Sequence, residues 1–152
     1  MEVKYRRIHE DELDELLRLY KQLLPDGEPL PADEYVLTVW QEILNDKKMS
    51  ILVAEAENRI VGSCVLTIIP NLTHGCTPYG FMENMITDEN YRGKGIGTGL
   101  LKYGLALAWE KGCSKVMGLT GRQTEQIFHF YENAGFKRGV KTGFIIKRED
   151  VK

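Results

Sequence analysis

A glycine-rich stretch at residues 88–99 contains the residue types and spacing that most clearly indicate chemistry. Its alternating glycines are Gly93, Gly95, Gly97 and Gly99. Glycine destabilises a helix interior by about 0.5–1 kcal/mol relative to alanine, so four glycines so close together indicate a specific structural or functional role. Bare N–H groups and the dipole at a helix N-terminus bind phosphate, and Arg92 and Lys94 add positive charge. The stretch therefore predicts an anion-binding turn that opens a helix, and the alternative is a flexible turn that binds nothing.

Two common nucleotide-binding patterns do not fit this turn. A phosphate-binding loop of the nucleotide triphosphatases needs Ser or Thr after its Gly-Lys pair, whereas Gly95 follows Lys94 here. A dinucleotide-binding turn needs a third glycine where Thr98 or Leu100 stands. The turn is therefore expected to bind a different phosphate-bearing ligand.

The remaining sequence predicts the elements that position this turn. Apolar residues at helical spacing indicate helices over residues 13–24, 33–44, 95–111 and 124–134. Branched and aromatic residues indicate strands over residues 3–8, 50–56, 60–69, 79–87 and 115–120. Residues 70–78 form a polar loop, and a last pair of strands begins at Phe136 and is divided near residues 141–143. The order β-α-α-β-β-β-α-β-α-β-β predicts an α/β (α+β) fold, a mixed sheet with helices on its faces.

Composition narrows the class of protein. The 152 residues suit one domain, residues 1–152, and the net charge of −2 argues against a nucleic-acid binder. Three cysteines without CxxC spacing argue against a disulfide framework or a metal site and favour a reducing cytoplasm. No segment approaches the ~20 apolar residues that span a membrane, and the first seven residues are too charged for a signal-peptide core.

A longer pattern surrounds the turn. Arg92, Gly95 and Gly97 form Arg-x-x-Gly-x-Gly, and the sequence Phe-Tyr-Glu-Asn-Ala-Gly-Phe follows at residues 130–136. Together these two landmarks resemble those of the GNAT superfamily of N-acetyltransferases, over about residues 83–136. The resemblance implies a GNAT-like mixed, mostly antiparallel central sheet of six or seven strands, flanked by about four helices.

The same resemblance implies acetyl-CoA as co-substrate, with no metal. The backbone of Met85, Ile86 and Thr87 would pair with the pantetheine arm like an added strand, and the turn would hold the pyrophosphate. Thr124 stands where many family members have Asn, and would cap the next helix and bond the pantetheine. The implied coenzyme-binding residues are Met85, Ile86, Thr87, Arg92, Gly93, Lys94, Gly95, Ile96, Gly97, Thr98, Thr124 and Tyr131.

Two residues are candidates for proton transfer. Tyr131 matches the family's tyrosine near the coenzyme sulfur and would protonate the leaving thiolate; the alternative is a core aromatic. Glu83 interrupts an apolar strand, where burial would make it a stronger base for deprotonating an ammonium group. Glu83-Asn84 also lies where glucosamine-phosphate N-acetyltransferases carry a Glu-Asp pair. This sequence differs from that pair at the second position, where Asn84 replaces the Asp. The alternatives for Glu83 are pairing with a basic residue or facing solvent.

We therefore expect a cytoplasmic N-acetyltransferase that moves an acetyl group to a primary amine of a small molecule by direct attack. Glu83 is the expected base and Tyr131 the expected acid. Two alternatives stay open: a protein or peptide N-acetyltransferase, and an acyl-CoA-binding sensor without turnover. The acceptor has no signature in the sequence, and a homodimer is expected by analogy with the family alone.

Overall fold

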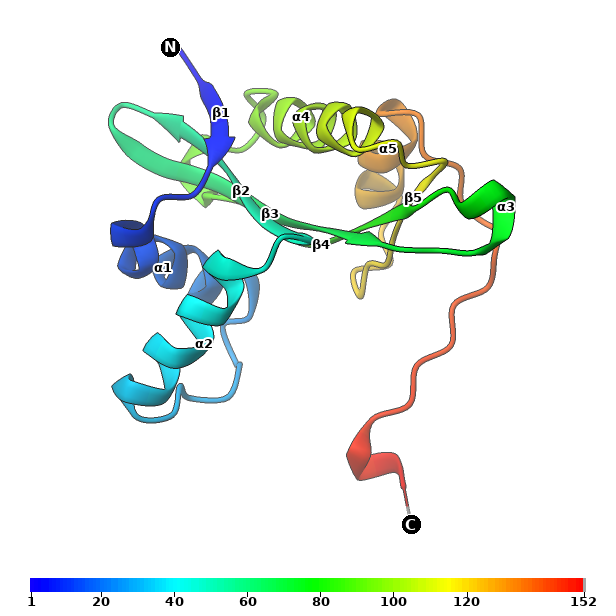
Figure 1. The fold of residues 1–152 in the computed structure, drawn as a ribbon. Coiled ribbons are helices and arrows are strands. Elements are labelled where there is room, and N and C mark those ends of the chain that lie inside the picture. Colours follow the sequence, from blue (N-terminus) through cyan, green and yellow to red (C-terminus); the bar gives the residue numbers. More distant parts are fainter. Residues whose placement is uncertain (152) are drawn as a thin grey trace. The chain divides into compact units, whose positions relative to one another are not determined.

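The computed structural model describes residues 1–151, which group into a first unit, residues 1–118, and a second unit from residue 119 onward (Figure 1). The helices and strands of the first unit are β1 (Lys4–Arg7), α1 (Leu13–Leu23), α2 (Asp33–Asn45), β2 (Met49–Ala56), β3 (Arg59–Ile69), α3 (Thr73–Cys76), β4 (Tyr79–Thr87), α4 (Ile96–Glu110) and β5 (Val116–Gly118). Short 3-10 helices precede α1 (Glu10–Glu12) and α4 (Glu89–Tyr91). The second unit contains α5 (Glu125–Asn133) and a 3-10 helix (Arg148–Asp150).

A five-stranded sheet in the order β1-β2-β3-β4-β5 forms the centre of the first unit. Neighbouring strands are antiparallel except β4 and β5, which are parallel. The mixed, mostly antiparallel sheet that the sequence predicts is thus confirmed. β2 and β3 are buried for most of their length because helices cover both faces of the sheet. Their branched side chains suit strands that water reaches on neither side.

Alternate residues of β2 point into two separate clusters, one on each face. Ile51 and Val53 pack with Leu19 of α1 and Trp40 of α2, and the Trp40 indole N–H donates to the carbonyl of Glu10 at 2.9 Å. On the opposite face the cluster is Ala54, Ala56, Val61 and Ile96, the first residue of α4. The period of two along the strand therefore fixes α1 and α2 on one face and α4 on the other.

β1, at one edge of the sheet, makes an unusually close contact with α4. The hydroxyl of Tyr5 lies 3.5 Å from the carbonyl oxygen of Ile96. A Cβ atom at Gly99 would lie 2.0 Å from that hydroxyl oxygen, which is closer than any real side chain sits. Glycine at position 99 is therefore what allows β1 to lie against the first turn of α4.

β4 contains a bulge where the chain approaches the glycine turn. Val65 of β3 pairs with Glu83, whereas Ser63 pairs with Ile86, so two residues of β4 oppose one residue of β3. Asn84 has a left-handed φ of 51°, a conformation that asparagine tolerates better than most residues. β5 pairs with β4 only over residues 80–82, so within the described chain the backbone after Met82 has no strand partner on that side.

The structure differs from the predicted fold at two places. The described residues contain five strands and not six or seven, because the pair of strands predicted after Phe136 is absent. Phe144, Ile145 and Ile146 have branched and aromatic strand-type side chains, but they are 93%, 82% and 76% exposed and pair with no strand in residues 1–151. A strand requires hydrogen-bonding partners as well as suitable residues, and the local sequence reveals only the residues.

The described α-helices number five and not about four, because the predicted loop at residues 70–78 includes the four-residue α3. Its His74 and Gly75 have left-handed φ values of 53° and 68°, so it is a tight turn without helical periodicity. The other predicted elements are confirmed with small shifts at their ends. No helix within residues 1–151 combines the length and the apolar character needed to cross a membrane.

Candidate active site

The turn between β4 and α4 exposes bare backbone. Gly93 and Gly95 have left-handed φ values of 73° and 78°, which residues with a side chain rarely adopt. No atom lies within 4 Å of the place where a Cβ atom would project from either residue. A ligand can therefore approach the main chain of this turn closely.

The first turn of α4 supplies hydrogen-bond donors at the same place. The first main-chain bond of the helix runs from the N–H of Gly99 to the carbonyl of Gly95, at 3.0 Å. The N–H groups of residues 96–98 precede that bond, so they lack helical acceptors and lie at the positive end of a 15-residue helix dipole. The side chain of Ile96 is buried and anchors this end of α4 in the core. The arrangement is suited to binding a phosphate group.

Two cationic side chains border the turn, and both are exposed and held by main-chain carbonyls. Arg92 Nε donates to the carbonyl of Thr87 at 3.0 Å, and Lys94 Nζ donates to that of Asn90 at 3.2 Å. Lys94 Nζ also lies 4.9 Å from the centre of the Tyr91 ring. These bonds keep both positive charges close to the glycines without filling the space above them.

A buried acidic residue, Asp88, begins the approach to the turn. It is only 3% exposed, and its carboxylate accepts hydrogen bonds from Arg18 Nη1 at 2.5 Å and from the N–H of Asn90 at 3.1 Å. Burial opposes ionisation, but the bonds from Arg18 and Asn90 outweigh it, so the pKa of Asp88 lies below its ordinary value. Sequence reasoning missed Arg18, because the two partners are 70 residues apart and no motif connects them.

The strand end that the resemblance implies for the pantetheine arm has one open side. Ile86 pairs with Ser63 and Thr87 with Gly62, both on the β3 side. The side chain of Ile86 is buried, and those of Met85 and Thr87 are half-buried. The side that faces away from β3 lies beyond the last residue that pairs with β5. An extended chain with amide groups could add to β4 there.

Glu83 lies on β4 immediately before the bulge, and its side chain is exposed. The carboxylate therefore lacks the burial that would have made it a stronger base, and it faces solvent. Its neighbour Asn84 has the left-handed φ and hydrogen-bonds Tyr20 of α1, whose pKa burial raises to about 12 despite that bond. Asn84 thus provides the left-handed residue of the bulge, and an Asp at this position would place a negative charge there.

The second landmark belongs to the second unit. The side-chain oxygen of Thr124 accepts a hydrogen bond from the N–H of Ile127 at 3.4 Å, so Thr124 caps α5 as the sequence predicts. Tyr131 is half-buried, and its ring meets those of Phe130 and Phe136 edge to face, with centres 5.0 Å and 5.6 Å away. This aromatic cluster fixes the direction of the Tyr131 ring.

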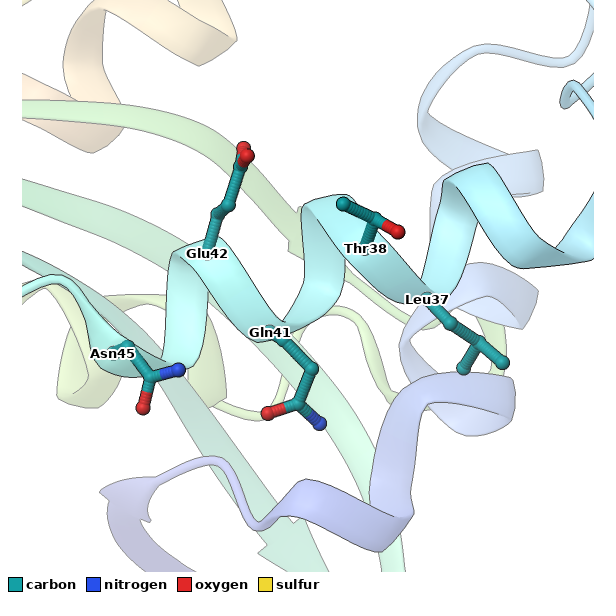
Figure 2. A pocket seen from close by; sticks show the side chains of 5 residues that line it. All are labelled: Leu37, Thr38, Gln41, Glu42 and Asn45. Carbon is teal, nitrogen blue, oxygen red and sulfur yellow. The ribbon is translucent and has the colours of Figure 1, made fainter.

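A hollow of about 560 Å³ lies on the outer side of α2, where Leu37, Thr38, Gln41, Glu42 and Asn45 line it (Figure 2). All five side chains come from one helix, and Glu42 is the one titratable group among them. The hollow therefore lacks the convergent groups of a catalytic centre. Across residues 1–151, no three His, Cys, Asp or Glu side chains gather to hold a metal ion. We therefore take the glycine turn as the candidate site.

Comparison with known sequences shows the family of the chain. Residues 11–136 match the model of the acetyltransferase (GNAT) family. The chain is 38% identical over 79 residues to a glucosamine 6-phosphate N-acetyltransferase of Trypanosoma brucei brucei, an alignment that covers 52% of each protein. The chain thus spans about half the length of this curated relative.

Solved structures extend the similarity to almost the whole chain. A provisionally assigned acetyltransferase of Agrobacterium tumefaciens str. C58 is 36% identical with a TM-score of 0.89, and the match covers 95% of this chain and 99% of that one. A protein of Bacillus halodurans C-125 described as a transcriptional regulator is 26% identical with a TM-score of 0.85, covering 96% and 99%. The match of residues 11–136 shows that this chain belongs to the acetyltransferase (GNAT) family.

Proposed function

We propose that this chain is an acetyl-CoA-dependent N-acetyltransferase that acts on a primary amine of a small molecule. The observation that supports this most is the continuity of two sites along the chain. The open side of β4 suits an extended amide-bearing arm, and the glycine turn, whose first glycine is Gly93, six residues after Thr87, suits a diphosphate. Coenzyme A joins these two chemical groups in the same order.

The proposed reaction needs no covalent enzyme intermediate. The free amine attacks the carbonyl carbon of the thioester, a C–N bond forms, and the C–S bond breaks. Glu83 takes the proton that the amine loses, and Tyr131 gives a proton to the leaving thiolate. The products are an amide and free coenzyme A. The exposure of Glu83 suits a base that meets an acceptor arriving from solvent.

The T. brucei relative suggests the first acceptor to test. Its name gives glucosamine 6-phosphate, a sugar that carries both a primary amine and a phosphate group, as its substrate. We propose an acceptor of this kind, an amino sugar or another small polar amine. Asn84 replaces the Asp of the Glu-Asp pair, so the contacts to the acceptor differ at this position.

Two alternative functions are tested together with the main proposal. The regulator described in B. halodurans favours a domain that binds acyl-CoA as a signal, without turnover. A Dictyostelium discoideum relative, 24% identical over 129 residues and named N-alpha-acetyltransferase 30, favours a protein or peptide acceptor. Release of thiol on a small amine, and not on peptides, supports the main proposal against both.

Three further parts of the proposal concern the whole molecule. We propose that residues 1–152 act as one acetyltransferase domain in the cytoplasm, where the three free cysteines Cys64, Cys76 and Cys113 stay reduced.

We also propose a homodimer. Support comes from Phe144, Ile145 and Ile146, whose exposed apolar side chains suit burial against a second copy. Light scattering tests this: wild type should have twice the monomer mass, and Ile145→Asp should be a monomer.

The experiment that tests the proposed function is calorimetric titration with acetyl-CoA, followed by thiol release against amino sugars, polyamines, amino acids and peptides. Binding and turnover on one small amine would support the enzyme and give its acceptor class. Binding without turnover on any amine would favour the sensor. No binding of acetyl-CoA would refute the assignment of the glycine turn.

A further inference from the structure

Polar side chains on one face of α1 hold the start of β3 and the segment that leads into the glycine turn. Glu15, Arg18 and Gln22 recur at i, i+3 and i+7 and therefore share a face. Glu15 Oε2 accepts the N–H of Ile60 at 2.7 Å, at the start of β3. Gln22 Oε1 accepts the N–H of Glu89 at 3.0 Å, directly after Asp88. The two contacts secure α1 at both ends of this face.

Arg18, between them, joins β3 to the start of the turn. Its Nη2 donates to the carbonyl of Ile60 at 2.8 Å, and its Nη1 donates to Asp88 Oδ2 at 2.5 Å. The side chains of Arg18 and Asp88 are 33% and 4% exposed, so the pair is largely sheltered from solvent and salt. A guanidinium fork binds both oxygens at once, which the single ammonium of a lysine does less well.

Hydrogen bonds continue from Asp88 to the glycines. The carbonyl of Asp88 accepts the N–H of Tyr91 at 2.8 Å, and its Oδ1 accepts the N–H of Asn90 at 3.1 Å. The carbonyl of Asn90 in turn accepts a hydrogen bond from Nζ of Lys94, the residue between Gly93 and Gly95 in the sequence. An unbroken series of bonds therefore connects α1 to the turn.

We propose that Arg18 is a positioning residue for the coenzyme: through Asp88 it holds the turn in the form that directs the N–H groups of residues 96–98 at the pyrophosphate. This inference rests on the proposed function. Arg18 contacts no coenzyme atom in this proposal and acts only through the backbone that it orients. Its loss should therefore weaken recognition of the pyrophosphate and leave the acetyl-transfer chemistry intact.

The test compares Arg18→Gln with wild type on two acetyl donors, acetyl-CoA and S-acetylpantetheine, which lacks the pyrophosphate. We expect the Kd and KM for acetyl-CoA to rise by about tenfold, because a hydrogen-bonded charge is lost from the support of the turn. We expect kcat at saturating acetyl-CoA, and kcat/KM for S-acetylpantetheine, to stay within about twofold of wild type. Arg18→Lys should lie between the two proteins.

Arg6→Gln is the matched control, because Arg6 also forms a sheltered ion pair, with Glu12 at 2.6 Å, and its side-chain hydrogen bonds lead to Glu12, Glu55 and the carbonyl of Arg7 and not to the turn. It should lose stability without a change in the Kd for acetyl-CoA. An unchanged Kd in Arg18→Gln, or equal losses on both donors, would overturn the inference. If Arg18→Gln does not fold, Gln22→Ala, which removes only the bond to Glu89, repeats the comparison. Failure of wild type to bind acetyl-CoA would instead refute the proposed function.

Discussion

Asp88 and Arg18 form a sheltered ion pair in which Nη1 of the arginine lies 2.5 Å from Oδ2 of the aspartate. The aspartate also caps the 3-10 helix that leads to the glycine turn, by accepting the N–H of Asn90. One carboxylate thus connects the first helix of the chain to the candidate phosphate site. Its charge therefore matters both for stability and for the shape of the turn.

The pKa of Asp88 in the folded protein lies below its ordinary value of 3.8, so the protein should lose stability in acid. The stabilisation is complete above about pH 5 and is lost as the pH falls through the lowered pKa, because the unfolded state binds the proton first. Asp88→Asn should weaken this acid dependence and cost about 1–3 kcal/mol at pH 7, since it leaves Arg18 without a charged partner. Urea denaturation from pH 7 down to pH 3 measures both effects.

Glu12 supplies the comparison for this experiment, because bonds from Arg6 also lower its pKa. Glu12→Gln should remove another part of the acid dependence while leaving acetyl-CoA binding unchanged. Equal pH profiles for wild type and Asp88→Asn would show that the Asp88 carboxylate does not contribute to the acid dependence.

Gly95→Asp should abolish acetyl-CoA binding. Aspartate would be strained at a φ of 78°, and its charge would project into the open space above the turn. We expect a loss of at least about a hundredfold in affinity, measured by calorimetry. Gly112→Asp is a matched control, with a φ of 81° and open space at the opposite end of α4. Tight binding by Gly95→Asp would refute the turn as the phosphate site.

Tyr131→Phe should lower kcat by about 10²–10⁴-fold if the hydroxyl protonates the thiolate. The aromatic contacts with Phe130 and Phe136 remain in this variant, so stability and coenzyme affinity should change little. Stopped-flow thiol release and calorimetry measure the two quantities. Tyr35→Phe, on the exposed side of α2, controls for loss of a hydroxyl elsewhere. A fully active Tyr131→Phe enzyme would mean that another group supplies the proton.

Glu83→Gln should lower kcat/KM, because glutamine cannot accept the proton of the amine. The Glu83 side chain is exposed and lies outside the core, so the free energy of unfolding should change by less than about 0.5 kcal/mol. Glu42→Gln in the hollow of α2 is the control for loss of one surface carboxylate. A Glu83→Gln variant with the kcat/KM of wild type would contradict the assignment of this base.

Local patterns in the sequence were sufficient for most elements of the first unit. The helix predicted over residues 95–111 is observed at Ile96–Glu110, because helical spacing and Gly112 both mark it. The strand predicted over residues 79–87 is confirmed with the same ends. These elements bury their own apolar residues, so the sequence of each one indicates its structure.

Features that depend on distant partners could not be predicted in this way. Phe144 and its neighbours have the residues of a strand, but pairing depends on a partner that the local sequence does not specify. The bulge at Asn84, directly after the exposed Glu83, has no periodicity in the sequence to reveal it. The bond of Arg18 to Asp88 joins residues that only the folded sheet brings together.

The contact of Tyr5 with Gly99 has a consequence for the order in which the protein is made. The fifth residue of the chain lies against the first turn of a helix that begins more than ninety residues later. A ribosome must therefore synthesise α4 before β1 can take its place beside it, and such late, distant contacts slow folding. Until then Ala54, Ala56 and Val61, which pack against Ile96 of α4 in the finished protein, lack this cover, and their apolar surface is open to association with other nascent chains.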